Sequence, residues 1–425
     1  MADPLDDLVK GFSDWRDTPF AKRAAGLEKA ADLLEERQES LARLMAQEMG
    51  KPITQGKAEA AKCATACRHY AAHGERMLAP VERESATLIY QPLGPVLAIM
   101  PWNFPLWQVF RFAAPALMAG NTILLKHASN VPGCAREIVK LIAEAFGRED
   151  LLQAVFISAE ETTALIGDPR VRAVTFTGST EAGRKVASAA GQHLKKSVLE
   201  LGGSDPYIVL EDADLAEAAK VCAAARMVNA GQSCIAAKRF LVVEEIYERF
   251  LDALAKELAE HVPGDPFDAA CKLGPMARVD LRDEIHRQVE DSIAAGARLI
   301  LGGTIPELLD GPYYPATLLA DVAPGMRVFN EETFGPVAAV VPVHDEFEAI
   351  DLANLTPFGL GGAVFSKDPA KARQVAERID TGTVAINGQV VSDPRFPFGG
   401  VKDSGWGREL GEEGIREFVN LKTLR

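Results

Sequence analysis

The sequence has few cysteines, a shortage of positive charge and no long hydrophobic run, and each shortage excludes a class of protein. Six cysteines among 425 residues are too sparse for a disulfide framework. The net charge of -14 disfavours a nucleic-acid groove or an anionic membrane surface as partner. The apolar run VLAIMPWNFPLW is too short and too rich in proline to cross a bilayer. We therefore expect neither a nucleic-acid nor a membrane partner.

The N-terminus and the cysteine spacing carry two further expectations. The N-terminal stretch MADPLDDLVK is acidic and lacks the hydrophobic region of a secretion signal, which predicts a cytoplasmic protein. Cys63 and Cys67 lie four residues apart in a helical stretch, but no CxxC pair or histidine cluster supports a zinc site. Small buried side chains are the favoured interpretation, and we predict no metal site.

The rest of the chain alternates between strand-like and helical patterns. Asp17-Thr18-Pro19 reads as a helix start, and apolar residues at helical spacing follow until Gly50 and Pro52. Beyond ATLIYQP, strand-like runs such as VLAIM, NTILLK, AVTFT and YIVL are separated by amphipathic runs. This alternation predicts an α/β protein with parallel sheets and crossover helices.

The pattern restarts after Asp205 with DPYIVLEDADLAEAAK, which predicts a second α/β domain. We expect that domain to begin just after Gly203 and to end near Gly407. The segment 81–91 and the tail VNLKTLR are strand-like but have no obvious place in either sheet. Such pieces commonly pair with each other or with a neighbouring chain.

Three motifs have the residues of a catalytic site, although each allows a plainer interpretation. In AVTFTGSTEAG, Gly178 and Gly183 frame a turn that could bring backbone N–H groups to a phosphate, or be only a strand–helix turn. Glu200 in SVLELGG could be a partly desolvated general base or a solvated strand end. Asn103 in PWNFPLW could donate to an oxyanion or cap a turn between prolines.

The combination of motifs is more specific than any one of them. PWNFPLW, FTGSTEAG, LELGG, GQSC, EETFGPV and PFGGVKDSGWGRE occur in the order found in the aldehyde dehydrogenase superfamily, which the chain resembles over essentially its full length. The stretches KHASN and AGQSCIAAKRF look most similar to the short bacterial succinate-semialdehyde dehydrogenases. The chain starts later than many members do.

This resemblance implies a fold with three parts. Residues 1–77 and 92–203 would form a Rossmann-like dinucleotide-binding domain, and residues 204–407 a second α/β catalytic domain. Residues 78–91 and 408–425 would form a small β oligomerisation extension that joins subunits into a homodimer or homotetramer.

The resemblance also implies a mechanism. Cys234 would attack the aldehyde as a thiolate, Asn103 and the Cys234 backbone N–H would hold the alkoxide, and hydride would pass to the nicotinamide. Glu200 would then activate the water that hydrolyses the thioester. The residues expected to bind the cofactor are Trp102, Lys126, Ser129, Gly178, Ser179, Gly183, Glu332 and Phe334.

Two departures from the family pattern bear on the cofactor and on regulation. Ser129 stands where many NAD-preferring members carry a glutamate for the adenosine ribose. With Lys126 three residues before it, this predicts NADP over NAD; alternatively, Ser129 only makes room and both cofactors bind. Ala236 stands where some relatives carry a second cysteine, so a disulfide switch there is excluded.

The substrate prediction depends on Arg111, eight residues after Asn103. Succinate-semialdehyde dehydrogenases carry an arginine at this spacing that binds the substrate carboxylate. By the same resemblance, Ser392 and Phe398 of this chain would lie on the loop that closes the pocket and would contact the substrate. The plainer interpretation is a helix arginine paired with a surface carboxylate. A second pocket arginine of some of these enzymes is absent, because that position is Val228. The alternatives are a dehydrogenase for another semialdehyde or an aliphatic aldehyde, a coenzyme-A-acylating member, against which Glu200 argues, and a non-catalytic binding protein on the same fold.

Overall fold

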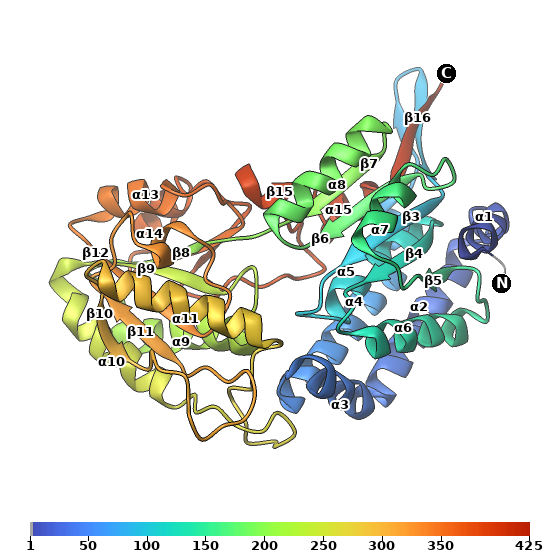
Figure 1. Ribbon diagram of the computed structural model, residues 1–425. Coiled ribbons are helices and arrows are strands. Elements are labelled where there is room, and N and C mark those ends of the chain that lie inside the picture. Colours follow the sequence, from blue (N-terminus) through green and yellow to red (C-terminus); the bar gives the residue numbers. More distant parts are fainter. Residues whose placement is uncertain (1–2) are drawn as a thin grey trace.

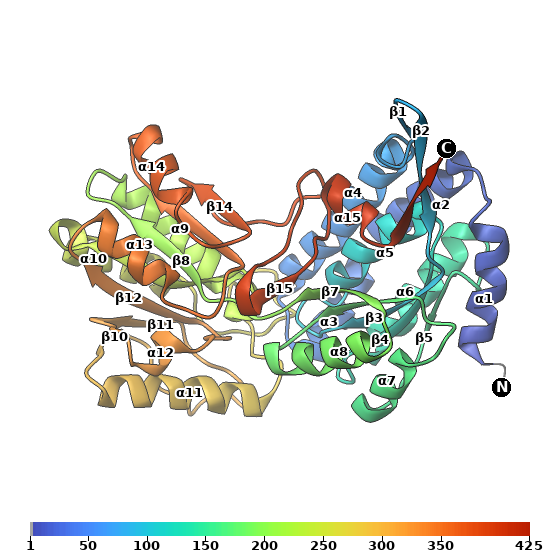
Figure 2. The ribbon, with the colours of Figure 1, turned by 90° about the horizontal axis from the view of Figure 1, so that it is seen from above.

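Two largely parallel sheets lie side by side, one from each half of the chain, and a small third sheet projects from the first half (Figure 1). The structure is a computed structural model and describes residues 3–425. Helices cover the faces of both large sheets (Figure 2). This architecture confirms the predicted α/β class.

The first half holds a six-stranded sheet in the order β15-β7-β6-β3-β4-β5, parallel except for β15. Its strands are β3 (Pro95–Met100), β4 (Thr122–His127), β5 (Leu152–Ala154), β6 (Ala173–Thr177), β7 (Lys196–Glu200) and β15 (Gly405–Trp406). Its helices are α1 (Pro4–Trp15), α2 (Phe20–Glu36), α3 (Gln38–Met49), α4 (Ile53–Met77), α5 (Trp107–Ala119), α6 (Pro132–Phe146), α7 (Ala159–Ile166) and α8 (Thr180–Gln192).

Strand β3 shows why helices cover both faces of this sheet. Val96, Ala98 and Met100 point into one core, which also holds apolar residues of α2 to α6. Leu97 and Ile99 point into the opposite core, together with residues of α1, α7 and α8. Since successive side chains of a strand alternate between faces, an unbroken apolar strand needs a packed layer on each side.

The second half holds a seven-stranded sheet in the order β10-β11-β12-β9-β8-β13-β14. Its strands are β8 (Asp205–Val209), β9 (Ala237–Val243), β10 (Arg298–Leu301), β11 (Thr317–Ala320), β12 (Val337–Val343), β13 (Gly361–Phe365) and β14 (Thr383–Ile386). Its helices are α9 (Leu215–Met227), α10 (Tyr247–Ala259), α11 (Val279–Ala294), α12 (Arg327–Asn330), α13 (Glu346–Asn354) and α14 (Pro369–Ala376). Only β10 is antiparallel to its neighbour.

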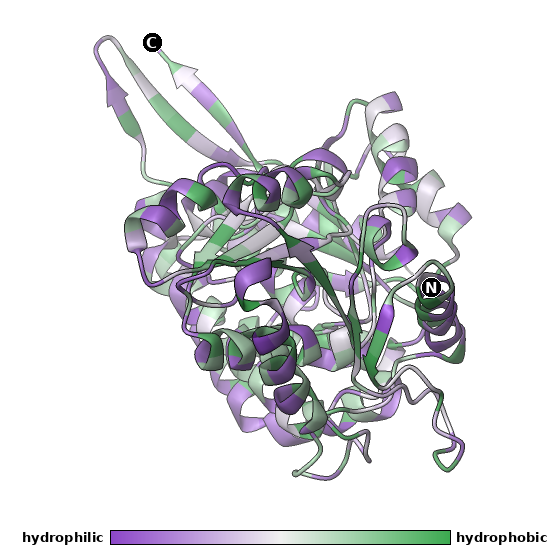
Figure 3. Cartoon of the chain, turned by 90° about the vertical axis from the view of Figure 1, so that its left-hand side faces the viewer, coloured by the Kyte–Doolittle hydropathy of each residue, from purple (hydrophilic) through white to green (hydrophobic). Residues whose placement is uncertain are grey.

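The third sheet pairs the two segments of the predicted oligomerisation extension, residues 78–91 and 408–425. It contains β1 (Val81–Arg83), β2 (Ala86–Pro92) and β16 (Val419–Leu424), in the order β1-β2-β16. It stands out from the body with hydrophobic and hydrophilic residues along its strands (Figure 3). The two strand-like pieces without a place in the large sheets do therefore pair with each other, from Val419 opposite Pro92 to Leu424 opposite Thr87.

The domain limits stay a prediction, and two local expectations need correction. Residues 405–406, inside the range predicted for the catalytic domain, return to the first sheet as β15. The expected single helix up to Met49 is two helices, which meet at Arg37. The helix start at Asp17 is also wrong, because α2 begins at Phe20 after Pro19 and has no side-chain cap. No helix in residues 3–425 combines the length and apolarity needed to cross a membrane.

Candidate active site

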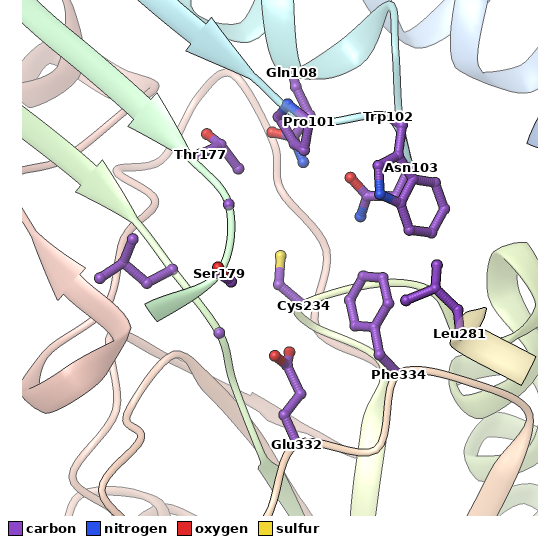
Figure 4. A pocket seen from close by; sticks show the side chains of 13 residues that line it. Pro101, Trp102, Asn103, Gln108, Thr177, Ser179, Cys234, Leu281, Glu332 and Phe334 are labelled. Carbon is purple, nitrogen blue, oxygen red and sulfur yellow. The ribbon is translucent and has the colours of Figure 1, made fainter. Parts of the chain in front are cut away.

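A cavity of about 260 Å³ lies between the two halves of the molecule. The first half lines it with residues from the β3–α5 connection and from the ends of β6 and β7. The second half contributes Cys234, Leu281, Glu332 and Phe334 (Figure 4). Predicted residues from separate motifs of the sequence therefore border one space.

Cys234 lies in a tightly held loop between α9 and β9. The loop begins with Asn229 and Ala230 at φ values of 52° and 54°, a left-handed conformation that asparagine tolerates better than alanine. The Cys234 thiol points into the cavity (Figure 4). Burial raises the pKa of Cys234 to about 12, although the charges of Arg111 and Lys238 act to lower it.

Asn103 lies beside Cys234 on the wall of the cavity. Its side-chain amide donates one hydrogen bond to the backbone oxygen of Gln232, at 3.1 Å. The Asn229 side chain donates to the backbone oxygen of Asn103, at 2.8 Å, and ties the two loops together. Because an asparagine amide has two N–H donors, a second one is available for an oxygen atom near the thiol.

Glu200 ends strand β7 and is almost fully buried, with 1% of its surface exposed. Its carboxylate is not part of the cavity wall and lies instead near Gly399, where a Cβ atom would come within 2.9 Å of Oε1. Burial raises the pKa of Glu200 well above its usual range, and the charge of Arg111 only partly opposes this. A raised pKa makes this carboxylate a stronger base than that of an exposed glutamate.

The candidate phosphate turn has the geometry of a helix start. Ser179 caps α8 by accepting a hydrogen bond from the N–H of Ala182 at 3.3 Å. Gly178 and Ser179 border the cavity. Gly183 lets α8 pack closely on the loop after β7, because a Cβ atom there would lie 2.3 Å from the Leu201 side chain. The start of a helix that carries partial positive charge therefore faces the cavity.

Glu332 is fixed by the glycine loop after β7, and two aromatic rings flank the space in front of it. Its Oε1 atom accepts a hydrogen bond from the N–H of Gly203 at 3.0 Å and lies 3.5 Å from Lys238 Nζ. The rings of Trp102 and Phe334 meet edge to face, with centroids 5.9 Å apart. This gives the cavity an apolar side opposite a carboxylate (Figure 4).

Lys126 and Ser129 lie at the end of β4, outside this cavity. Ser129 is exposed and Lys126 is half-buried, which lowers the pKa of Lys126. Between them His127 is buried, with Nε2 2.9 Å from the Pro105 oxygen and Nδ1 accepting from the N–H of Ala128. Burial lowers the pKa of His127 to about 4, so this imidazole is neutral and anchors the turn.

Arg111 does not border the cavity with Cys234. Its guanidinium forms an ion pair with Glu409, and these side chains are only 2% and 3% exposed. It also donates to Thr177 Oγ1 at 3.3 Å and covers the ring of Phe398. The plainer interpretation, a helix arginine paired with a surface carboxylate, is right about the ion pair but wrong about its position, because Glu409 is buried. Its role in substrate binding stays a prediction.

Ser392 receives two hydrogen bonds from helices of the first half. Lys62 Nζ on α4 donates to Ser392 Oγ at 2.7 Å, and Trp107 Nε1 on α5 donates to the same atom at 3.0 Å.

No group of three or more possible metal ligands occurs among residues 3–425. Cys63 and Cys67 are buried and unbridged, and burial raises the pKa of both thiols.

Comparison with known proteins assigns the chain to a family. Residues 6–424 match the model of the aldehyde dehydrogenase family. The chain belongs to the aldehyde dehydrogenase family. This confirms the resemblance seen in the motifs.

Relatives of this aldehyde dehydrogenase match it along nearly their whole length. A protein of Synechocystis named as a probable succinate-semialdehyde dehydrogenase (NADP+) is 50% identical, over 99% of this chain and 93% of its own. The Escherichia coli protein named succinate semialdehyde dehydrogenase (NAD(P)+) Sad is also 50% identical, over 100% and 93%. The structure of a succinic semialdehyde dehydrogenase from Streptococcus pyogenes with NADP+ superposes with a TM-score of 0.96 at 36% identity, covering 99% and 94%.

Some residues around the site of this aldehyde dehydrogenase were not singled out from its sequence. Lys238 is buried, and its Nζ donates to the backbone oxygens of Ser233 and Cys234, at 2.9 and 2.5 Å. Lys238 follows Cys234 by four residues in an apolar run, and a charged residue there is the signal that could have found it. Nothing in the sequence around Glu409 indicates that it is buried, because its ion-pair partner, Arg111, is distant in the sequence.

Proposed function

We propose that this aldehyde dehydrogenase oxidises succinate semialdehyde to succinate with NADP. One observation carries the chemistry: the Cys234 thiol and the Asn103 amide border the same cavity as five of the residues expected to hold the cofactor, which are Trp102, Gly178, Ser179, Glu332 and Phe334. The substrate and the cofactor are proposed from the names of the relatives, together with Ser129 at the end of β4. Oxidation of other semialdehydes or of aliphatic aldehydes is the alternative.

The residues present fit a nicotinamide dinucleotide. The start of α8 offers backbone N–H groups to a pyrophosphate, and Trp102 and Phe334 offer an apolar wall to the nicotinamide. Glu332 is positioned to accept hydrogen bonds from a ribose hydroxyl, because only its Oε1 is engaged by Gly203. Lys126 and Ser129 would lie near the adenosine ribose, without a carboxylate that repels a 2′-phosphate.

In the proposed mechanism, the Cys234 thiol loses its proton to solvent water, and the sulfur of the resulting thiolate bonds to the aldehyde carbon. The second N–H of Asn103 and the Cys234 backbone N–H donate to the oxygen as it becomes negative. A bound NADP would supply the acceptor for a hydride from this carbon, and a thioester would then remain on Cys234. Burial disfavours the thiolate of Cys234, whereas the charges of Arg111 and Lys238 favour it.

Glu200 is the proposed base for the second half of the reaction. It removes a proton from water as the water oxygen attacks the thioester carbon; the carbon–sulfur bond then breaks, and succinate leaves. Its carboxylate lies outside the cavity wall, near Gly399, so the side chain must turn toward Cys234 to reach this water. A raised pKa suits this task, since it makes Glu200 a stronger base than an exposed glutamate.

An aldehyde panel tests the proposal. Succinate semialdehyde, glutarate semialdehyde, butanal and hexanal are each oxidised with NADP and, separately, with NAD. We expect the highest kcat/KM for succinate semialdehyde with NADP and no turnover by Cys234→Ala. A higher kcat/KM for butanal, or for NAD, would overturn the proposed substrate or cofactor. Appreciable turnover by Cys234→Ala would overturn the nucleophile.

The proposal includes a homodimer or homotetramer in the cytoplasm. The third sheet supports oligomerisation, because β1 and β16 are its two edge strands and β16 exposes Leu421 and Leu424. An exposed edge strand offers unpaired backbone groups to another chain. Light scattering of the purified enzyme tests this, and a monomer at micromolar concentration would contradict it.

A further inference from the structure

Arg111 and Lys238 near Cys234, and Lys62 near Arg111, are the candidate cations to meet a negatively charged substrate. Arg111 already forms an ion pair with Glu409, and both side chains are buried. Lys238 already holds two backbone oxygens of the catalytic loop and lies near Glu332. Lys62 is the exception, since it forms no ion pair in the part of the chain that the structure describes.

Lys62 is directed at the start of α5, the helix that follows Asn103. One turn before it on α4, Glu59 accepts hydrogen bonds from the N–H groups of Leu106 and Trp107, at 2.8 and 2.9 Å. These bonds fix the start of α5 against α4. Lys62 Nζ then lies 4.2 Å from the centre of the Trp107 ring.

Three hydrogen-bond donors meet at this point. The Lys62 ammonium and the Trp107 indole N–H both donate to Ser392 Oγ, and the Ser392 hydroxyl adds its own proton. None of the three donors borders the cavity of Cys234 itself, but Gln108, the next residue after Trp107, does. The donor cluster and the cavity wall therefore occupy adjacent positions of α5.

We propose that Lys62, together with the Trp107 indole N–H and the Ser392 hydroxyl, binds the distal carboxylate of the aldehyde substrate. This inference rests on the proposed function and names the residues that would select its substrate class. A carboxylate accepts several hydrogen bonds at once, and a charged donor makes the strongest of them. The two donors that now share Ser392 Oγ would turn to the carboxylate oxygens.

The surroundings of Lys62 favour an anion. Burial, with repulsion from Arg111, lowers the pKa of Lys62 to about 8. The nearby carboxylates of Glu59 and Asp393 are already paired with Lys51 and Arg395, so they offer little compensation. A bound carboxylate would supply the missing negative charge, whereas an uncharged aldehyde would leave the ammonium poorly solvated.

The test compares Lys62→Met with Lys62→Arg and with a control, Lys57→Met. Lys57 is on the same helix, but its partner is Glu39 on the surface. The measured quantity is the ratio of kcat/KM for succinate semialdehyde to that for butanal, with NADP. Both values come from one preparation, so a change in the folded fraction cancels.

We expect Lys62→Met to lower this ratio by roughly tenfold to several hundredfold, mainly through KM for succinate semialdehyde. Lys62→Arg should keep most of the ratio, and Lys57→Met should leave it unchanged. As a second measurement, succinate should inhibit butanal oxidation by the wild type, and Lys62→Met should weaken this inhibition at least about tenfold.

Three results would overturn the inference. If the wild type prefers succinate semialdehyde and Lys62→Met keeps both the preference and the inhibition by succinate, Lys62 does not bind the carboxylate, although the proposed function stands. If Lys57→Met lowers the ratio as much as Lys62→Met, the effect is a general loss of positive charge. If the wild type itself has no preference, the proposed substrate and the role of Lys62 are both wrong.

Discussion

Removing the charge of Arg111 should cost this enzyme much of its stability. The Arg111 and Glu409 side chains are 2% and 3% exposed. In Arg111→Met the Glu409 carboxyl stays buried without its cation, and Glu200 loses a nearby positive charge. Removing one partner of a buried ion pair costs about 3–5 kcal/mol, compared with about 0–1 kcal/mol for an exposed pair. Because folded domains are stable by only about 5–15 kcal/mol, this loss is large.

The loss in Arg111→Met should also grow with pH. Burial raises the folded-state pKa of Glu409 and Glu200, and Arg111 lowers both. A carboxyl group whose folded pKa lies above its unfolded value of about 4.3 favours folding while protonated and loses that advantage as pH rises through the folded pKa. Since Arg111→Met raises both folded values further, its deficit relative to the wild type should be smaller at pH 5 than at pH 8.

Urea unfolding, followed by tryptophan fluorescence at pH 5 and pH 8, measures these effects. Arg184→Met is the control, because its ion pair with Asp403 is largely exposed at 66% and 40%. The double variant Arg111→Met/Glu409→Met should recover most of the loss, since apolar residues of similar volume often replace a buried pair at little cost. A loss below about 1 kcal/mol in Arg111→Met, with activity falling only on succinate semialdehyde, would refute this reasoning and favour carboxylate binding by Arg111.

The remaining predictions concern the base, the cofactor and the catalytic loop. Glu200→Gln should still transfer hydride and then stall, with an acyl adduct on Cys234 seen by mass spectrometry; steady turnover without an adduct would point to another base. In the wild type, burial raises the pKa of Glu200, so its basic form and the deacylation rate should increase with pH well above the usual range of about 4–4.5, and an acid limb inside that range would contradict the assignment. Ser129→Glu should shift the ratio of kcat/KM values from NADP toward NAD by at least about tenfold, and an unmoved ratio would exclude this position as the selector. Lys238→Met should lower kcat by about 10–100-fold and raise KM for the cofactor, because it releases the carbonyl of Cys234 and the nearby Glu332; unchanged values of both would make Lys238 a packing residue only.

Local patterns in the sequence predicted the parts of the molecule that depend on neighbouring residues. Apolar strands such as VLAIM became central strands, because only a doubly covered strand can bury every side chain. The motifs around Cys234, Asn103 and Glu332 meet at one cavity, since each lies in a connection close to the end of an element. Helix ends were harder to predict, because the cap expected at Asp17 competes with Pro19, whose fixed backbone already leads into α2.

Contacts between distant segments could not be predicted from local patterns. Lys62 and Ser392 are 330 positions apart, and nothing near either residue indicates the other. Glu409 likewise meets Arg111 only because the chain, after completing the second sheet, returns to the first sheet as β15.

Strand β15 has a consequence for the order in which the enzyme folds during synthesis. Gly405 pairs with Glu200, so one edge of the first sheet stays uncovered until almost the whole chain has left the ribosome. The N-terminal half is made first, and an uncovered strand can pair with other nascent chains. Residues 1–203 expressed alone should therefore aggregate, and adding residues 204–425 later as a separate chain should rescue little of this material. The strand that carries the proposed base is among the last parts of the first half to reach its final surroundings.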